Sequence, residues 1–132
     1  MVKTKLVFQD FQSALDRFEE VMTKSSDDLK RDAAVKRFEF TFELAWKTMK
    51  YYLSEAEGEI TTGSKDVIRK AFVAKLIEYN ELWIEMVELR NRTVHTYNLA
   101  FVQELYETDL PKILLLFKEL EKNIACNLIN KY

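Results

Sequence analysis

Hydrophobic residues recur at steps of three and four along most of the chain, which is the spacing of one face of an α-helix. The first such run extends from about residue 4 to residue 23 and ends in a polar stretch, residues 24–28. Its hydrophobic positions are Phe8, Phe11, Leu15, Phe18 and Met22. This pattern predicts an amphipathic helix at the start of the chain.

A longer hydrophobic run follows, and residues that favour helix ends bound it. Asp27 or Asp28 offers a short side-chain acceptor for the free N–H groups at a helix start. Gly58 lies at the expected end, because a residue without Cβ readily adopts the left-handed conformation there. Phe40 and the tyrosines at 51–52 lie beside the main stripe, so this helix has apolar surface for several neighbours, and one neighbour can be a second copy of the chain. The stripe itself consists of Val35, Phe38, Phe42, Ala45, Trp46, Met49 and Leu53.

Three further helical regions are predicted in the second half of the chain. Residues 61–64 form a loop in which Ser64 caps a short third helix, and a fourth helix begins near Asn80. In the last region Pro111 lacks an N–H group and must kink or restart the helix near residues 108–109. The stripe positions are Val67, Ile68, Ala71, Phe72 and Leu76, then Leu82, Trp83, Met86, Leu89 and Thr93, and finally Leu105, Tyr106, Leu110, Ile113, Leu116, Phe117, Leu120 and Ile124.

Because no stretch alternates with period two, the pattern predicts an all-α fold, an up-and-down antiparallel bundle of four to five helices. Composition agrees with this prediction. The chain has 132 residues, which suits one domain over residues 1–132, and 48% of them are hydrophobic, enough for a core. Only two glycines and one proline are present, whereas an all-β chain of this length needs many turn residues.

Charge and cysteine content exclude several classes of function. The formal net charge is −2, so the chain is not a generally basic nucleic-acid-binding protein, although a local basic patch is compatible with it. Cys126 is the only cysteine, which excludes an intrachain disulfide and a zinc site built on cysteines. Residues 1–5 lack an apolar signal core and no run is long enough to span a membrane, so we expect a cytoplasmic protein without membrane association.

The segment from residue 90 to residue 97 concentrates chemically active side chains at the end of the fourth predicted helix. His95 is the only histidine of the chain. Asn91 precedes it by four residues, about 40° around a helix, and can hydrogen-bond and orient its imidazole. Arg90 and Arg92 add positive charge, and Tyr97 adds a hydroxyl group just past the helix end.

Two interpretations of this segment follow from the residues alone. In the structural one, Arg90 pairs with Glu85 or Glu88, and the polar residues after it satisfy the helix terminus. In the functional one, Arg90 holds a phosphate while His95 exchanges a proton near neutral pH. That combination suits cleavage of RNA without a metal, with the ribose 2′-hydroxyl as nucleophile. Such a reaction uses an acid and a base, so a twofold dimer with two clusters across one cleft would supply the second histidine.

The same residues resemble a known motif. Arg90-Asn91-x-x-x-His95-x-Tyr97 is similar to the Arg-(x)4-6-His motif of the HEPN superfamily, in the form with Asn after the Arg and His-x-Tyr at the end. The chain departs from its relatives at Gly63-Ser64-Lys65, where they often have Ser-Pro. Other stretches that resemble the family are residues 38–39 and 43–47, residues 66–72, and Trp83 with Met86, so the resemblance covers most of residues 8–125.

The resemblance is strongest to a subgroup in which a HEPN protein is paired with a small MNT-type nucleotidyltransferase. Members have been called nucleotidyltransferase substrate-binding proteins. The resemblance implies a helical homodimer and a toxin that is a metal-independent endoribonuclease, needs no cofactor and is restrained by its nucleotidyltransferase antitoxin. It implies that Arg90 stabilises the RNA phosphate, that His95 is general acid or base and that Asn91 orients His95. It also implies that the partner can transfer AMP to Tyr97, which would bring negative charge and bulk into the RNA cleft.

Two alternatives to the enzyme remain. The chain can be a non-catalytic subunit that presents a nucleotide or substrate to a separate nucleotidyltransferase, with Arg90 and His95 as ligands. It can also be a purely structural dimer.

Other candidate sites are interpreted as structural. Two groups of basic residues can track a phosphate backbone, but solvated helix faces fit a chain with many acids better. Both tryptophans lie on apolar stripes and are expected in the core. Four glutamates suggest a metal site in a bundle, but such sites need Glu-x-x-His pairs that a single histidine cannot provide. Cys126 has no histidine or basic group beside it except Lys122, and no glycine-rich phosphate loop is present. The first basic group is Lys65, Arg69, Lys70 and Lys75, and the second is Lys30, Arg31, Lys36 and Arg37. The tryptophans are Trp46 and Trp83, and the glutamates are Glu39, Glu43, Glu85 and Glu88.

Overall fold

The computed structural model describes residues 1–24, 27–95 and 98–130. The helices in these ranges are α1 (Val2–Thr23), α2 (Asp28–Glu57), α3 (Ser64–Val73), α4 (Glu81–His95), α5 (Leu99–Glu104), the π-helix η1 (Leu105–Asp109) and α6 (Leu110–Asn130). Because α5, η1 and α6 follow one another without a break, the described ranges contain five helical rods and no strand. The predicted all-α bundle is confirmed.

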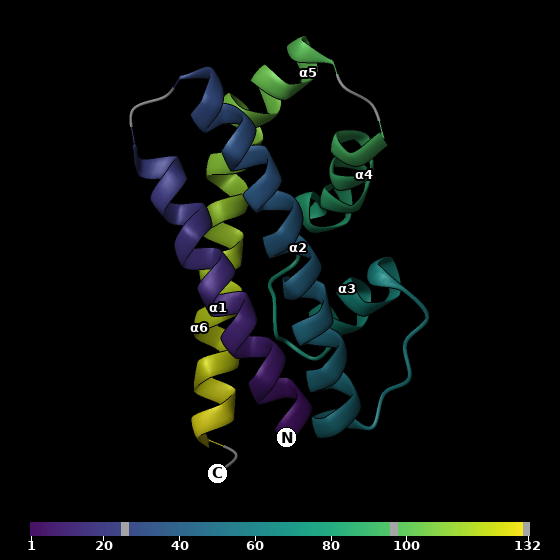
Figure 1. The fold of residues 1–132 in the computed structure, drawn as a ribbon. Helices are drawn as coiled ribbons and strands as arrows, with labels where there is room; N and C mark the ends of the chain where they lie inside the picture. The colour runs from purple at the N-terminus through teal and green to yellow at the C-terminus, as the bar shows by residue number, and fades with distance from the viewer. Residues whose placement is uncertain (25–26, 96–97, 131–132) are drawn as a thin grey trace.

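Helix α2 is the centre of the bundle. The long helices α1 and α6 lie along one side of it, and the shorter α3 and α4 lie along the other (Figure 1). The two ends of the chain lie at the same end of the molecule (Figure 1). Helix α2 therefore has several neighbours within one chain, α1, α3, α4 and α6, and Tyr52 is buried among them, whereas Phe40 stays 56% exposed.

Aromatic rings link the helices through the core. The Phe117 ring on α6 lies 6.1 Å from that of Phe11 and 5.9 Å from that of Phe18, both on α1. The Trp83 ring on α4 lies 5.9 Å from the same phenyl group. Edge-to-face and tilted pairs at such distances are favourable because the ring edge and the ring face carry opposite partial charge. Trp83 is 2% exposed and belongs to the core as predicted.

The ends of α2 follow the predicted chemistry. The Asp27 carboxylate accepts a hydrogen bond from the Lys30 N–H at 2.8 Å, and Gly58 has a left-handed φ of 67°. The start of α3 differs from the prediction, because Ser64 is the first helical residue and does not cap the helix with its side chain. Gly63 takes the cap position, and the Asp66 carboxylate accepts the Thr62 N–H at 3.0 Å instead.

The end of α3 also corrects the predicted stripe. The helix ends at Val73, and Lys75 adopts a φ of 64° in the turn that follows. Leu76 is buried as expected, but it lies past the helix, and its N–H reaches back to the Ala71 carbonyl at 2.9 Å. Phe72, predicted as a core position, is 43% exposed, and its ring lies 5.4 Å from that of Tyr79, which is also exposed.

The last rod changes its winding just before its proline, in the predicted place. Residues 105–109 form the π-helix, and the Leu110 N–H donates to the Leu105 carbonyl five residues earlier. Pro111 cannot donate to a carbonyl of the preceding turn, and the wider π turn accommodates this loss without ending the rod.

Within the described ranges, no helix combines the length and the apolar character that crossing a membrane requires.

Candidate active site at the end of helix α4

Arg90 is held against α2 by a carboxylate from a distant part of the sequence. Its Nη1 atom donates to Oε2 of Glu43 at 2.5 Å, and its guanidinium carbon lies 5.5 Å from the centre of the Phe42 ring. The predicted pairing with Glu85 or Glu88 is wrong, because Arg90 faces α2 and Glu88 instead pairs with Lys65 at 2.7 Å. The Arg90 side chain is half-buried.

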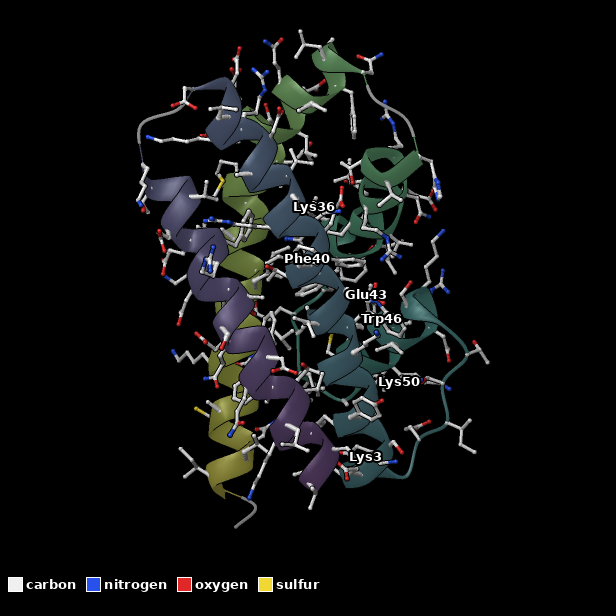
Figure 2. All side chains as sticks on the ribbon, viewed as in Figure 1. Lys3, Lys36, Phe40, Glu43, Trp46 and Lys50 are labelled. Atoms are coloured by element: carbon white, nitrogen blue, oxygen red, sulfur yellow. The ribbon has the colours of Figure 1, made fainter. Side chains whose placement is uncertain are left out.

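Glu43 is a shared acceptor for side chains of α2 and α4. Besides Arg90, the Trp46 indole Nε1 donates to its Oε2 at 3.1 Å, and Lys47 lies 3.4 Å from Oε1. Partial burial raises the pKa of Glu43, but the hydrogen bonds from Trp46 and Arg90 outweigh it and hold the pKa below the usual value. Figure 2 shows Glu43 and Trp46 on the side of α2 that faces α3 and α4. Trp46 is only half-buried, at the edge of the core in which it was predicted.

Asn91 contacts the arginine beside it. Its Oδ1 accepts a hydrogen bond from Nε of Arg90 at 3.3 Å. Together with Glu43, Asn91 therefore fixes two of the three guanidinium nitrogens, and among the described residues Nη2 has no partner. In the same ranges no hydrogen bond joins Asn91 to His95.

His95 is the last residue of α4, and its side chain is exposed. Within residues 1–24, 27–95 and 98–130 its imidazole makes no hydrogen bond or ion pair. Arg90 and His95 are five residues apart on one helix, which corresponds to a rise of about 7.5 Å along its axis. Tyr97, the predicted site of modification, lies outside the described residues.

Arg92 joins the end of α4 to the start of α5. Its guanidinium carbon lies 3.8 Å from the centre of the Phe101 ring, a stacked cation–π contact. Asn98 caps α5 by accepting the Phe101 N–H at 3.1 Å. Only the charge of Arg92 was evident from the sequence, since nothing in a helical pattern shows that Arg92 contacts Phe101.

The structure also tests the sets of residues interpreted as structural. Among the residues that it describes, no three His, Cys, Asp or Glu side chains are close enough to share a metal ion. Lys65 pairs with Glu88, and Lys70 pairs with Asp66 at 3.3 Å, so carboxylates offset much of the basic group around α3. Glu43, which the sequence suggested only as a candidate metal ligand, is the site residue that sequence reasoning did not predict.

Comparison with known proteins places this chain in a family. Residues 6–125 match the family model described as "Nucleotidyltransferase substrate binding protein like". The chain is 34% identical over 79 residues to a Haemophilus influenzae protein named "Probable ribonuclease HepT", and the match covers 55% of this chain. It spans about half of that relative's length, 53%.

A solved structure has a similar fold and sequence. A crystal structure of a protein from Thermus thermophilus superimposes with a TM-score of 0.77 at 35% sequence identity. The similarity covers 83% of this chain and 94% of that one. Because the family model matches nearly the whole length of this chain, the chain belongs to the nucleotidyltransferase substrate-binding protein family, the HEPN subgroup that is paired with MNT-type nucleotidyltransferases.

Proposed function

We propose that the chain is a metal-independent endoribonuclease that acts as a homodimer, the toxin of a pair whose antitoxin is an MNT-type nucleotidyltransferase. The observation that carries this proposal is the arrangement on α4. Arg90 is half-buried and fixed by Glu43, while His95 is exposed at the end of the same helix. The name of the Haemophilus influenzae relative favours the same class of reaction.

The proposed chemistry uses the ribose 2′-hydroxyl of the RNA as nucleophile. His95 of one subunit takes the hydroxyl proton, the 2′ oxygen attacks phosphorus, and the bond from phosphorus to the 5′ oxygen breaks. His95 of the partner subunit donates a proton to the leaving 5′ oxygen. The products are a 2′,3′-cyclic phosphate and a 5′-hydroxyl end, so no water or metal ion enters the step.

Arg90 and Asn91 support this reaction without exchanging protons. A guanidinium fixed by two contacts can direct its remaining Nη2 edge at the phosphate and stabilise charge that develops there. Asn91 lies four residues before His95 on the same face of α4. Its amide nitrogen can therefore orient the imidazole.

The test is RNA cleavage by purified, partner-free and unmodified protein with EDTA present. The wild-type protein should cut RNA, and His95→Gln and Arg90→Gln should each reduce the rate by at least about 100-fold. Arg69→Gln on α3 is the matched control for loss of one positive charge and should cut normally. The proposal is wrong if no cleavage occurs in EDTA, or if His95→Gln cuts as fast as wild type.

Control of the enzyme is proposed to act on Tyr97. An adenylyl group there would add a negatively charged phosphate next to the site that binds the RNA phosphate, and so repel the substrate. Incubation with ATP and the MNT partner should add AMP to the intact mass of the wild-type chain and leave Tyr97→Phe unchanged. An equal mass gain in Tyr97→Phe would place the modification on another residue.

A second candidate function is a non-catalytic subunit that presents a nucleotide or another substrate to the nucleotidyltransferase. The description of the matched family favours it. Calorimetric titration with ATP distinguishes the two functions. Binding that depends on Arg90, without RNA cleavage in EDTA, would support the binding subunit; cleavage without nucleotide binding would support the enzyme.

A further inference from the structure

We propose that a groove between α1 and α2 binds a single-stranded segment of RNA, with one base stacked on Phe40 and the backbone phosphates held by basic side chains from both helices. This inference rests on the proposed ribonuclease function and locates part of its substrate strand. The groove is separate from the Arg90 and His95 side chains, which do not line it.

The groove has the size and lining that such a ligand needs. Its volume is 370 Å³, at the lower end of the roughly 300–1,000 Å³ typical of ligand sites. Two small residues leave room for a flat ring to approach the helices, and every charged residue of the lining is basic. The lining consists of Ala14, Arg17, Ala33, Lys36, Arg37 and Phe40.

Phe40 contributes little to the core of the chain. Its side chain is 56% exposed, and Nζ of Lys36 lies 5.2 Å from the centre of its ring. Proteins that bind single-stranded nucleic acids without reading a sequence combine an aromatic platform with cations beside it. Phe40 and Lys36 reproduce that combination on the surface of α2.

The cations of the groove keep much of their charge. Nη1 of Arg37 crosses to α1 and donates to the backbone carbonyl of Arg17 at 2.9 Å, a partner that carries no charge. The Arg17 side chain has no carboxylate partner among the described residues. Lys36 lies 3.4 Å from Glu39, but its side chain is largely exposed, so this pair is weak.

Glu20, an acidic residue near the groove, is engaged mainly by a cation outside it. Glu20, on the same side of α1, pairs with Lys24 at 3.0 Å. The hydrogen bond from Lys24 lowers the pKa of Glu20, and the charges of Arg37 and Arg17 lower it further. Glu20 therefore interacts more strongly with Lys24 than with the two arginines of the groove.

Along α2, Phe40 is the lining residue of the groove that is nearest to the candidate active site. Phe40 precedes Glu43 by three residues, a rise of about 4.5 Å along α2. Figure 2 shows Lys36, Phe40 and Glu43 in succession along that helix. Because Glu43 holds Arg90, a strand that lies in the groove can continue onto the phosphate site of Arg90.

The experiment measures RNA binding separately from cleavage. Fluorescence anisotropy would follow a labelled 12-nucleotide oligouridylate in EDTA, with His95→Ala as the parent so that the RNA stays intact. Phe40→Leu keeps an apolar side chain but loses the ring, and the expected loss of affinity is about tenfold. Arg17→Gln combined with Lys36→Gln removes two cations and should lower the slope of log K against log salt concentration by about one unit or more.

Lys112→Gln combined with Lys122→Gln on α6 is the matched control. It removes the same charge from another surface and should leave affinity within about twofold of the parent. The proposal that RNA binds in the groove is contradicted if Phe40→Leu and the double variant of Arg17 and Lys36 bind RNA as tightly as this control does. It is also contradicted if Phe40→Leu lowers the mass measured by light scattering, because Phe40 would then belong to a contact between two copies.

The outcome also separates this inference from the proposed function. Binding that depends on the groove, with no cleavage by the wild-type protein in EDTA, would support the groove and reject the ribonuclease. Normal cleavage by wild type together with unchanged RNA binding by the groove variants would support the ribonuclease and reject the groove as an RNA-binding site.

Discussion

At the scale of single residues, the site depends on a contact that joins two distant parts of the chain. Arg90 and Glu43 are 47 residues apart in the sequence, and their side chains meet only because α4 packs against α2. Arg90, Asn91 and His95 could be grouped from the sequence because they follow one another within a single helix. Glu43 could not, because helical spacing gives the face of a helix but not which residue of a neighbouring helix lies opposite it.

Loss of the Glu43 charge should therefore impair Arg90. Glu43→Gln keeps the size of the side chain and an acceptor for Trp46, but weakens its hold on the guanidinium. We expect RNA cleavage to slow by about 10- to 100-fold, which corresponds to the strength of a hydrogen bond between charged groups. The measurement is the single-turnover cleavage rate in EDTA.

Glu88→Gln is the control for this variant. It removes the ion pair with Lys65, which is of comparable length but lies at an exposed position. Neither the activation free energy of cleavage nor the free energy of unfolding should change by more than about 0.5 kcal/mol. Equal rates for Glu43→Gln and Glu88→Gln would show that Glu43 does not position Arg90.

Asp109 in the π-helix makes the free energy of unfolding depend on pH, and the sign of this dependence follows from its pKa shift. Desolvation and the nearby charge of Glu104 raise its pKa above the ordinary value of 3.8. In the pH window just above that value the folded chain binds this proton more tightly than the unfolded chain does. The contribution of Asp109 to the free energy of unfolding therefore falls as pH rises through the window.

Asp109→Asn should remove this contribution. Urea unfolding curves of wild type and variant, measured from pH 3.5 to pH 6, should show the variant gaining stability relative to wild type as pH rises. A difference between the two that stays constant over this range would contradict the assignment.

At the scale of helices, the sequence predicted most boundaries because the chemistry of helix ends is local. Asp27 and Gly58 bound α2 as expected, since capping depends only on neighbouring backbone groups. Ser64 is not the cap because α3 begins one residue earlier than predicted, so that Gly63 takes the cap position. The π-helix itself could not be predicted, because a proline requires only that a hydrogen bond be lost and not how the chain accommodates the loss.

The two glycines of the chain provide a matched test of the α2 end. Gly58 has a φ of 67°, whereas Gly63 has an extended φ of 172°, and an added Cβ would meet no atom within 4 Å at either position. Gly58→Ala should lower the free energy of unfolding by about 1–2 kcal/mol, the cost of a left-handed residue with a Cβ. Gly63→Ala should leave it within about 0.5 kcal/mol of wild type. Urea unfolding checks both values, and equal losses would contradict the role given to the left-handed turn.

At the scale of the whole molecule, one chain supplies half of the proposed site. The chain has a single histidine, while the proposed reaction uses an acid and a base. Cleavage should therefore depend on association of two copies, and the rate per chain should fall on dilution below the dimer dissociation constant. Light scattering and cleavage rates on one dilution series measure both quantities. A constant rate per chain in samples that scatter as monomers would contradict the shared site.

The most direct test of the central claim is the chemistry of the RNA ends. A defined oligoribonucleotide, incubated with wild-type protein in EDTA, should yield 2′,3′-cyclic phosphate and 5′-hydroxyl ends in mass spectra. The same oligonucleotide with a 2′-deoxyribose at the cleaved position should stay intact, as should the unmodified one with His95→Gln. Cleavage at the deoxy position, or products with 5′-phosphate and 3′-hydroxyl ends, would contradict the account, because neither can arise from a 2′-hydroxyl activated by His95.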